Sequence, residues 1–500
     1  MMFIMGRGKI VEESALSRLP ASLLGTIVLI FLVGVFPLAI VGFTPGNGHN
    51  AWLGACAIMI IAGVRFSWVL ASRERRLFEM VVWLFFYVFL GAAPMVQLRE
   101  ALDPSTTPDV HHEFDWVTVA IVIVSEFAII GGSFLGKFKR SPKQTHEASA
   151  IRPTRVNLLA VGSIIFASMY TVRIGPAALF ASRDGRSEAT AIAFPDPTTS
   201  AIVTAAVTMG LLVSVVAQLQ LRRESKMLGS RTPFVLLGAS TVALALCANP
   251  ISTPRYVFGT VVLGYLAALG IYSTPLRFRL ASIGAVVGLV FLFPLLDVFR
   301  RNLDATLALE SPLQSFLSGD YDAFAQVNNS AVYVDRVGIT WGNQAMGVLF
   351  FWVPRSVWST KPVDTGILLA NSRQYEFTNL SAPLPAEMFI NGGWVLVIAG
   401  MFALGYALRR WDARSEHTLT MQGIPTILGC IIPFYLLIVL RGSLLQSMAY
   451  LTVILIAAWF VSQPARKKRV LDGWPHATQS GHTAIHSLSA NGLQPRPKLH

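Results

Sequence analysis

Apolar residues gather along the chain in runs of roughly 18–24, which are long enough to cross a bilayer as helices. Short polar segments, many of them basic, separate these runs. The pattern predicts an all-α polytopic integral membrane protein with about twelve transmembrane helices. We expect these spans at 20–42, 51–71, 78–98, 115–136, 156–178, 199–220, 232–248, 255–273, 279–297, 388–408, 423–440 and 443–462.

The composition excludes several classes of protein. Hydrophobic residues make up 53% of the chain and charged residues only 13%, against about 25% charged in soluble domains. A soluble enzyme, a disordered chain and a secreted disulfide scaffold are therefore excluded. All three cysteines, Cys56, Cys247 and Cys430, fall inside apolar runs, so we interpret them as small core residues rather than disulfide or metal ligands.

The basic residues give the expected orientation. The net charge is +13, but Lys and Arg occupy short loops instead of forming the basic groove that nucleic acid requires. Alternate loops are rich and poor in these residues, as in Arg73–Arg76 against 43–50. Since cytoplasmic loops carry the excess of Lys and Arg, both termini are predicted to be cytoplasmic.

Two regions depart from the regular pattern of spans. Residues 298–387 form a predicted extracytoplasmic loop of unusual length, and long loops in compact proteins are usually functional. Within it, 345–358 is apolar but too short to span, which predicts a short interfacial or re-entrant helix. Residues 1–462 would then form the transmembrane domain, and 463–500 a cytoplasmic tail, first basic and then disordered.

Arginines on the predicted outer side are the main candidates for ligand binding. Arginine offers a planar fork of donors that suits phosphate oxygens. The alternatives are contact with lipid head groups and pairing with nearby carboxylates. The cations on this side are Arg183, Arg186, Arg255, Arg300, Arg301, Arg336, Arg355, Lys361, Arg373 and Arg441.

Four acidic positions are candidates for chemistry. Asp320, within Gly319–Asp322, is a turn residue, a general base or sugar contact, or a metal ligand. Glu387 precedes a span, where it is a helix cap or an activator of an acceptor hydroxyl. Glu126 lies inside a span, and we expect it to pair with Arg65, with a proton or ion pathway as the alternative. Asp297, at the outer end of a span, is better placed for a site than Glu126.

Two stretches resemble a known family. Val353–Pro362 resembles the P-R-x-x-W-x-x-K-P stretch of the oligosaccharide repeat unit polymerases, the Wzy-type O-antigen polymerases. Pro383–Trp394 looks like the P-x-x-E-x-Y/F-x-N-F/x-G motif of the same family, and Gly319–Asp322 is also similar to its pattern. The match covers roughly 319–400, within a chain whose multi-span plan also fits. The chain departs from the motif at Gly392, where an aromatic residue is expected.

The resemblance implies a reaction at the outer face of the cytoplasmic (inner) membrane of a bacterium. A glycan on undecaprenyl pyrophosphate is transferred as a block to the non-reducing sugar of a new lipid-linked repeat unit, and the product is a surface polysaccharide. No metal or other cofactor is required, and the expected partners are the lipid-linked oligosaccharide, membrane lipid, a chain-length regulator and a flippase.

The site residues follow partly from the resemblance and partly from charge. Carried onto matching positions, Glu387, Asp320 and Arg355 are the candidate catalytic residues, and Lys361 is a candidate for binding the pyrophosphate. Arg183, Arg186, Arg300, Arg336 and Arg441 join Lys361 on the basis of charge and topology.

Three other functions stay open. An O-antigen ligase shares the donor, but resemblance to that family implies a His in the long loop, and 298–387 contains none. A twelve-span secondary transporter or flippase would place its long loop centrally in the cytoplasm. A non-catalytic export or chain-length component would not need an arginine-rich pocket.

Overall fold

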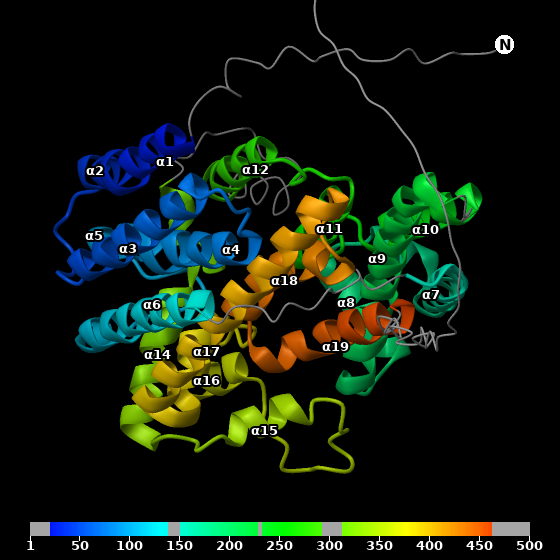
Figure 1. Cartoon of the computed structure of the whole chain (residues 1–500). Coiled ribbons are helices and arrows are strands. Elements are labelled where there is room, and N and C mark those ends of the chain that lie inside the picture. Colours follow the sequence, from blue (N-terminus) through cyan, green and yellow to red (C-terminus); the bar gives the residue numbers. More distant parts are fainter. Residues whose placement is uncertain (1–20, 139–150, 229–232, 293–312, 463–500) are drawn as a thin grey trace, which may run out of the picture.

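A computed structural model describes residues 21–138, 151–228, 233–292 and 313–462. These residues form helices and connecting turns, with no β-strand among them (Figure 1). The helices are α1 (Ala21–Leu29) with η2 (Ile30–Val35) and α2 (Phe36–Phe43), α3 (Trp52–Ala71), α4 (Leu77–Phe85) with η3 (Phe86–Ala92) and α5 (Ala93–Glu100), η4 (His112–Phe114) with α6 (Asp115–Phe138), α7 (Pro153–Ile174), η5 (Pro176–Phe180), α8 (Arg183–Ala193), α9 (Pro197–Leu228), α10 (Phe234–Cys247), α11 (Arg255–Ala268), α12 (Pro275–Val287) with η6 (Gly288–Leu292), η7 (Gln314–Leu317), η8 (Gly319–Tyr321), α14 (Ala323–Val337), α15 (Asn343–Leu349), α16 (Thr365–Arg373), α17 (Leu384–Gln422), α18 (Ile427–Arg441) and α19 (Leu444–Val461).

The helices confirm a polytopic integral membrane protein. Eight of the described helices, counting continuous ones together, are long and apolar enough to cross a bilayer. Three shorter apolar helices, α10, α11 and α18, match the predicted spans 232–248, 255–273 and 423–440. Span 279–297 corresponds to α12 and η6 as far as Leu292, and its remainder lies outside the described residues. The total of twelve spans therefore stays a prediction.

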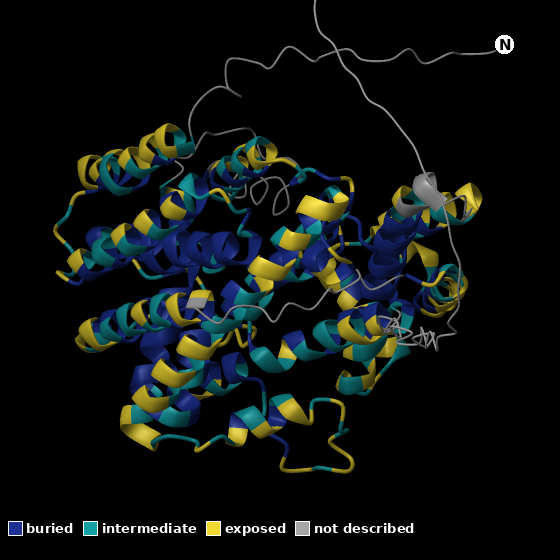
Figure 2. Cartoon of the chain, viewed as in Figure 1, coloured by how far each residue is buried: buried dark blue, intermediate teal, exposed yellow. Residues whose placement is uncertain are grey.

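The continuous helix α4–η3–α5 forms the centre of the bundle. Every residue of its most apolar 18-residue stretch is buried, including Trp83 and Tyr87 (Figure 2). It packs against α3 and α18. Outer helices instead expose large apolar side chains such as Phe43 and Val235, as lipid-facing helices do. The helix α4–η3–α5 is apolar on all sides, which fits its position among other helices inside the bundle.

Glycines bring α6 and α17 into direct backbone contact. A Cβ on Gly132 would lie 1.9 Å from the carbonyl oxygen of Phe402, and one on Gly405 would lie 2.1 Å from that of Ile129. Small residues at such crossings permit the close approach on which helix association in membranes depends. This packing fixes α17, whose N-terminal end carries Glu387.

The predicted long loop over 298–387 contains more helical structure in its described part than the sequence indicated. Residues 313–387 contain α14, α15 and α16, and α14 is buried over Ala323–Val332 against α6 and α17. The polar residues of α14 pair inside the bundle, as Gln326 does with Thr107 at 2.9 Å and Asn328 with Asp115 at 3.1 Å. Because these partners are more than 200 residues away in sequence, the apolar pattern could not reveal the helix as core.

The short helix that the sequence predicts near 345–358 is shorter than expected. Only α15, Asn343–Leu349, is helical, and turns follow it. Pro354 cannot donate a backbone hydrogen bond and restricts the residue before it, so a helix cannot continue undisturbed through this position. The exposed Trp352 and Val357 lie in these turns.

A break in α17 lies at Gly392 and Gly393. Gly393 has φ +57° and ψ −150°, a conformation that glycine adopts without a Cβ clash. The break frees the carbonyls of Ile390 and Asn391, which accept hydrogen bonds from the backbone NH groups of Thr340 and Gly342 at 2.9 and 3.0 Å. The break at these glycines therefore allows α17 to hold the segment between α14 and α15 by backbone hydrogen bonds.

Candidate functional site

Glu387 is buried among polar groups from three helix N-termini. Its Oε2 accepts from the Thr365 hydroxyl at 2.9 Å, and its Oε1 accepts from the Ser443 hydroxyl at 3.1 Å and the backbone NH of Leu444 at 3.0 Å. Glu387 is 1% exposed. The carboxylate thus sits at the start of α19, where the helix dipole favours negative charge, rather than capping its own helix as one reading of the sequence suggested.

Asp364 is a second carboxyl group beside Glu387. It caps α16 by accepting from the backbone NH of Gly366 at 2.9 Å, and it is buried. Burial raises the pKa of Asp364 to about 6, although Ser443 and the NH groups of Gly366 and Ile367 oppose the rise. Its carboxyl group therefore changes protonation near neutral pH, as a general acid or base must.

Two arginine–aspartate pairs contact the segments that lead into α17 and α19. Arg255 Nη1 lies 2.6 Å from Asp320 Oδ2, and Arg441 Nη2 lies 3.2 Å from Asp322 Oδ1. Arg441 also donates from Nε to the backbone oxygen of Asp320 at 3.1 Å, and it lies over the ring of Tyr256 at 4.9 Å. Asp322 is buried, and burial raises the pKa of its carboxyl group, although Arg441 and Ser381 act in the opposite direction.

Backbone hydrogen bonds join the two groups into one unit. The NH of Ser381 donates to Asp322 Oδ2 at 3.2 Å, and the NH of Ala382 donates to the carbonyl oxygen of Arg441 at 3.2 Å. Ser443, which holds Glu387, follows Arg441 by two residues. We call this unit the carboxylate–arginine cluster, which consists of Arg255, Asp320, Asp322, Asp364, Glu387 and Arg441.

The cluster unites three of the residues that the sequence assigned to the site: Glu387, Asp320 and Arg441. Arg255 was among the outer-side candidates for ligand binding but was not assigned to the site, and Asp322 and Asp364 were missed. Two of these residues could have been found from the sequence. Arg255 is the lone cation of a short loop on the side that is poor in Lys and Arg, and Asp322 belongs to the Gly319–Asp322 segment. For Asp364 the sequence offers only its position, two residues after the Lys-Pro end of the first motif.

Arg355 and Lys361 lie outside the cluster and brace the turn that contains them. Arg355 donates to the carbonyl oxygens of Lys361 and Pro362 at 2.7 and 3.0 Å. Lys361 donates from Nζ to the carbonyl oxygens of Phe351 and Val353 at 2.7 and 2.9 Å. Burial and the neighbouring Arg355 lower the pKa of Lys361. The two motif cations fold the segment that leads into α16.

The remaining predicted arginines have separate environments. Arg186 is buried and donates to the Cys247 carbonyl oxygen at 2.8 Å, so it joins α8 to the end of α10. Arg183 is exposed in the first turn of α8. Arg336 lies 3.0 Å from a ring nitrogen of His111. Arg300 and Asp297 lie outside the described residues. Among the described ones, Arg186 bonds to the end of α10 and Arg336 lies beside His111, so neither bonds to a carboxyl group of the cluster.

The expected pair of Arg65 and Glu126 is wrong. Arg65 lies 3.8 Å from Glu79, which also accepts from the Ser133 hydroxyl. Both carboxyl oxygens of Glu126 are buried without a hydrogen-bond partner in the part of the chain that the structure describes. The sequence placed Arg65 and Glu126 at compatible depths but could not identify Glu79, at the start of α4, as the nearer carboxylate.

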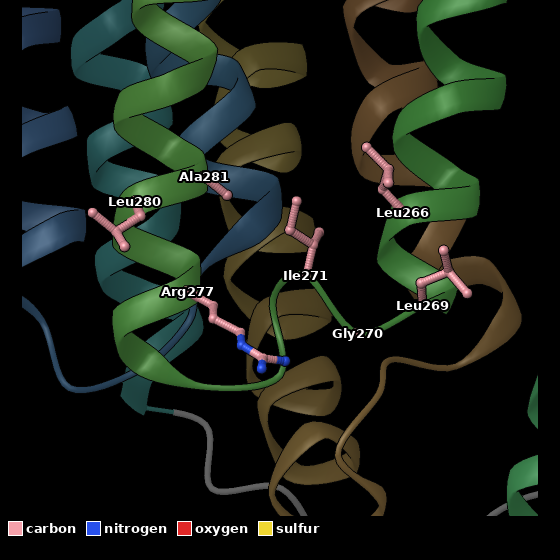
Figure 3. Close-up of a pocket in the computed structure, with 7 residues that line it drawn as sticks. All are labelled: Leu266, Leu269, Gly270, Ile271, Arg277, Leu280 and Ala281. Carbon is pink, nitrogen blue, oxygen red and sulfur yellow. The ribbon is translucent and has the colours of Figure 1, made fainter. Parts of the chain in front are cut away.

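A separate cavity lies far from the cluster along α11. It has a volume of about 530 Å³ and lies between the C-terminal end of α11 and α12 (Figure 3). Its lining is apolar except for Arg277. Arg255 stands at the opposite end of α11, about 20 Å away for a helix of 14 residues. The cavity is therefore separate from the candidate site.

No protein-family model, curated protein or solved structure matches the chain.

Proposed function

We propose that the chain polymerises undecaprenyl-pyrophosphate-linked oligosaccharide repeat units into a surface polysaccharide. The carboxylate–arginine cluster is the main support, because it combines buried carboxyl groups with guanidinium groups next to the two motif stretches. The alternation of basic loops supports the outer face of the membrane as its location.

In the proposed reaction, the bond between the sugar C1 of the growing glycan and its pyrophosphate oxygen breaks. A new bond forms between that C1 and the hydroxyl oxygen of the acceptor sugar. Glu387, assisted by Asp364, accepts the hydroxyl proton. Undecaprenyl pyrophosphate leaves with the negative charge, which Arg255 and Arg441 stabilise. Asp320 and Asp322 position these two arginines, and Arg355 and Lys361 hold the turn before α16.

Substitutions at the cluster test this proposal in a strain that lacks the native gene. Glu387→Gln keeps the size of the side chain and removes the ionisable group, so we expect loss of polymer longer than one repeat while the protein still inserts. Glu113→Gln, an exposed glutamate outside the cluster, is the matched control and should restore the full ladder of chain lengths. A full ladder with Glu387→Gln would refute the catalytic assignment.

A second candidate rests on one contact. Ligase-type glycan transfer implies a histidine in the long loop, and 298–387 contains none, but His111 from the segment before α6 lies beside Arg336 of α14, which belongs to that loop. A ligase would transfer finished glycan to a terminal acceptor instead of extending it. Deleting the gene would then remove surface attachment and leave the length of lipid-linked glycan unchanged.

A further inference from the structure

A second polar cluster lies near the start of α6 and is independent of the proposed reaction. His49 comes from the segment between α2 and α3, whereas His112 and Asp115 come from η4 and the first residue of α6. One potential ligand atom from each of these three residues lies within 4.8 Å of the other two. Two imidazoles and a carboxylate are a donor set that zinc accepts.

Polar neighbours orient two of the three side chains. His112 presents Nδ1 to Asp115 Oδ2 at 2.9 Å and Nε2 to Asp103 Oδ1 at 3.3 Å. Asp115 accepts at Oδ1 from the amide of Asn328 at 3.1 Å. In metal sites the ligand histidine commonly binds a carboxylate through its other nitrogen, and ligand carboxylates are themselves hydrogen-bonded. Asp103 and Asn328 occupy these supporting positions.

A small cavity lies at the same place. Its volume is about 10 Å³, and Asp103, His112 and Asp115 contribute to its lining. A space of this size holds roughly one water-sized particle. His49 stacks on His112 with ring centroids 3.5 Å apart and planes at 12°. Because a metal lies in the plane of each imidazole that binds it, the half-buried His49 ring must turn to share an ion with His112.

We propose that His49, His112 and Asp115 bind a zinc ion, with a water as the fourth ligand. Imidazole nitrogens disfavour Mg²⁺ and Ca²⁺, which prefer oxygen ligands. A tetrahedral zinc ion holds its nitrogen and oxygen ligands about 3.3 Å apart, so the three groups must draw together around it. Asp103 fixes the His112 ring, and Asn328 fixes the Asp115 carboxylate.

The ion would stabilise the segment that bears His49 against the segment before α6. That second segment also contacts arginines of α14 and α16, since Asp109 accepts from Arg373 through its backbone oxygen and His111 lies beside Arg336. The expected role is therefore structural: the ion would hold the 101–115 segment in the position from which it contacts α14 and α16.

Zinc titration of the purified full-length protein tests the proposal. The chain is purified in detergent with a tag that contains no histidine, stripped with a chelator, and titrated with ZnCl2 against a chromophoric chelator. We expect one tight zinc equivalent that His112→Ala loses. His111→Ala removes the adjacent histidine, which does not belong to the ligand set, and should keep that equivalent. Zinc bound by histidines elsewhere in the chain is common to all variants and cancels in the difference.

Two further measurements exclude loss of folding as the explanation. Asn328→Ala leaves all three ligands in place and should weaken zinc binding about 10-fold. Zinc should also raise the melting temperature of the stripped wild-type protein but not that of Asp115→Asn. Equal zinc stoichiometry and affinity in His112→Ala and His111→Ala would overturn the proposal, as would absence of tight zinc binding in a wild-type protein that elutes as a single species.

Discussion

The pair of Arg441 and Asp322 offers a quantitative test of the carboxylate–arginine cluster. The Asp322 side chain is 2% exposed, so its carboxylate depends on Arg441 Nη2 at 3.2 Å and the NH of Ser381. Removing one partner of a buried ion pair typically costs 3–5 kcal/mol because the other charge is left unpaired. We therefore expect Arg441→Met to reduce the free energy of unfolding by about 3–5 kcal/mol.

The double variant separates this pairing from other effects. Asp322→Asn leaves Arg441 bonded to the carbonyl oxygen of Asp320, so its expected cost is about 1.5–3 kcal/mol, the value of one charged hydrogen bond. With both charges removed, no unpaired charge remains buried, and the double variant should lose about 1.5–3 kcal/mol less than the sum of the single variants.

Unfolding in mixed detergent and SDS micelles, followed by circular dichroism, measures these free energies. Arg186→Met combined with Asp322→Asn is the control, because Arg186 bonds to the end of α10 and shares no hydrogen-bond partner with Asp322. That control pair should be additive within about 0.5 kcal/mol. If Arg441→Met and Asp322→Asn were additive to the same degree, the coupling within the cluster would be refuted.

Two other predictions concern packing and pH. Gly405→Val should destabilise the contact between α6 and α17 by about 1–3 kcal/mol, since its Cβ meets the Ile129 backbone. Gly162→Val is the control, because the space around Gly162 is open and a side chain there meets no steric clash. Equal melting temperatures of the two variants would contradict the packing. The raised pKa of Asp364 means that the folded state binds a proton more tightly than the unfolded state. The protonated Asp364 therefore contributes to the free energy of unfolding below pH 4, and this contribution is lost as the pH rises through about 6. The total loss is on the order of 3 kcal/mol. Asp364→Asn keeps an oxygen for the cap of α16 and should abolish this slope; an unchanged pH profile of unfolding would contradict the assignment.

Apolar runs predicted the membrane-spanning helices because length and hydropathy are properties of each segment alone. They could not predict α14, whose buried Gln326, Asn328 and Asn329 read as polar loop until distant partners are known. They also could not distinguish arginines that bind carbonyl oxygens, such as Arg355 and Arg186, from arginines paired with carboxylates, because both have the same sequence signature.

The candidate site was predictable where charge stood out against an apolar background. Arg441 was identified in this way as the lone cation of its loop, whereas Glu387 and Asp320 came from the stretches that resemble the polymerase family. Asp364 and Ser443 became recognisable only when α16 and α19 brought their N-termini beside Glu387. Residue chemistry therefore indicated some members of the cluster, and helix packing supplied the others.

The length distribution of the surface glycan after deletion of the gene tests the proposed function most directly. Synthesis, export and attachment of single repeat units continue without a polymerase, so the account predicts collapse of the ladder to one repeat unit. An unchanged ladder would contradict the proposal that this protein polymerises glycan.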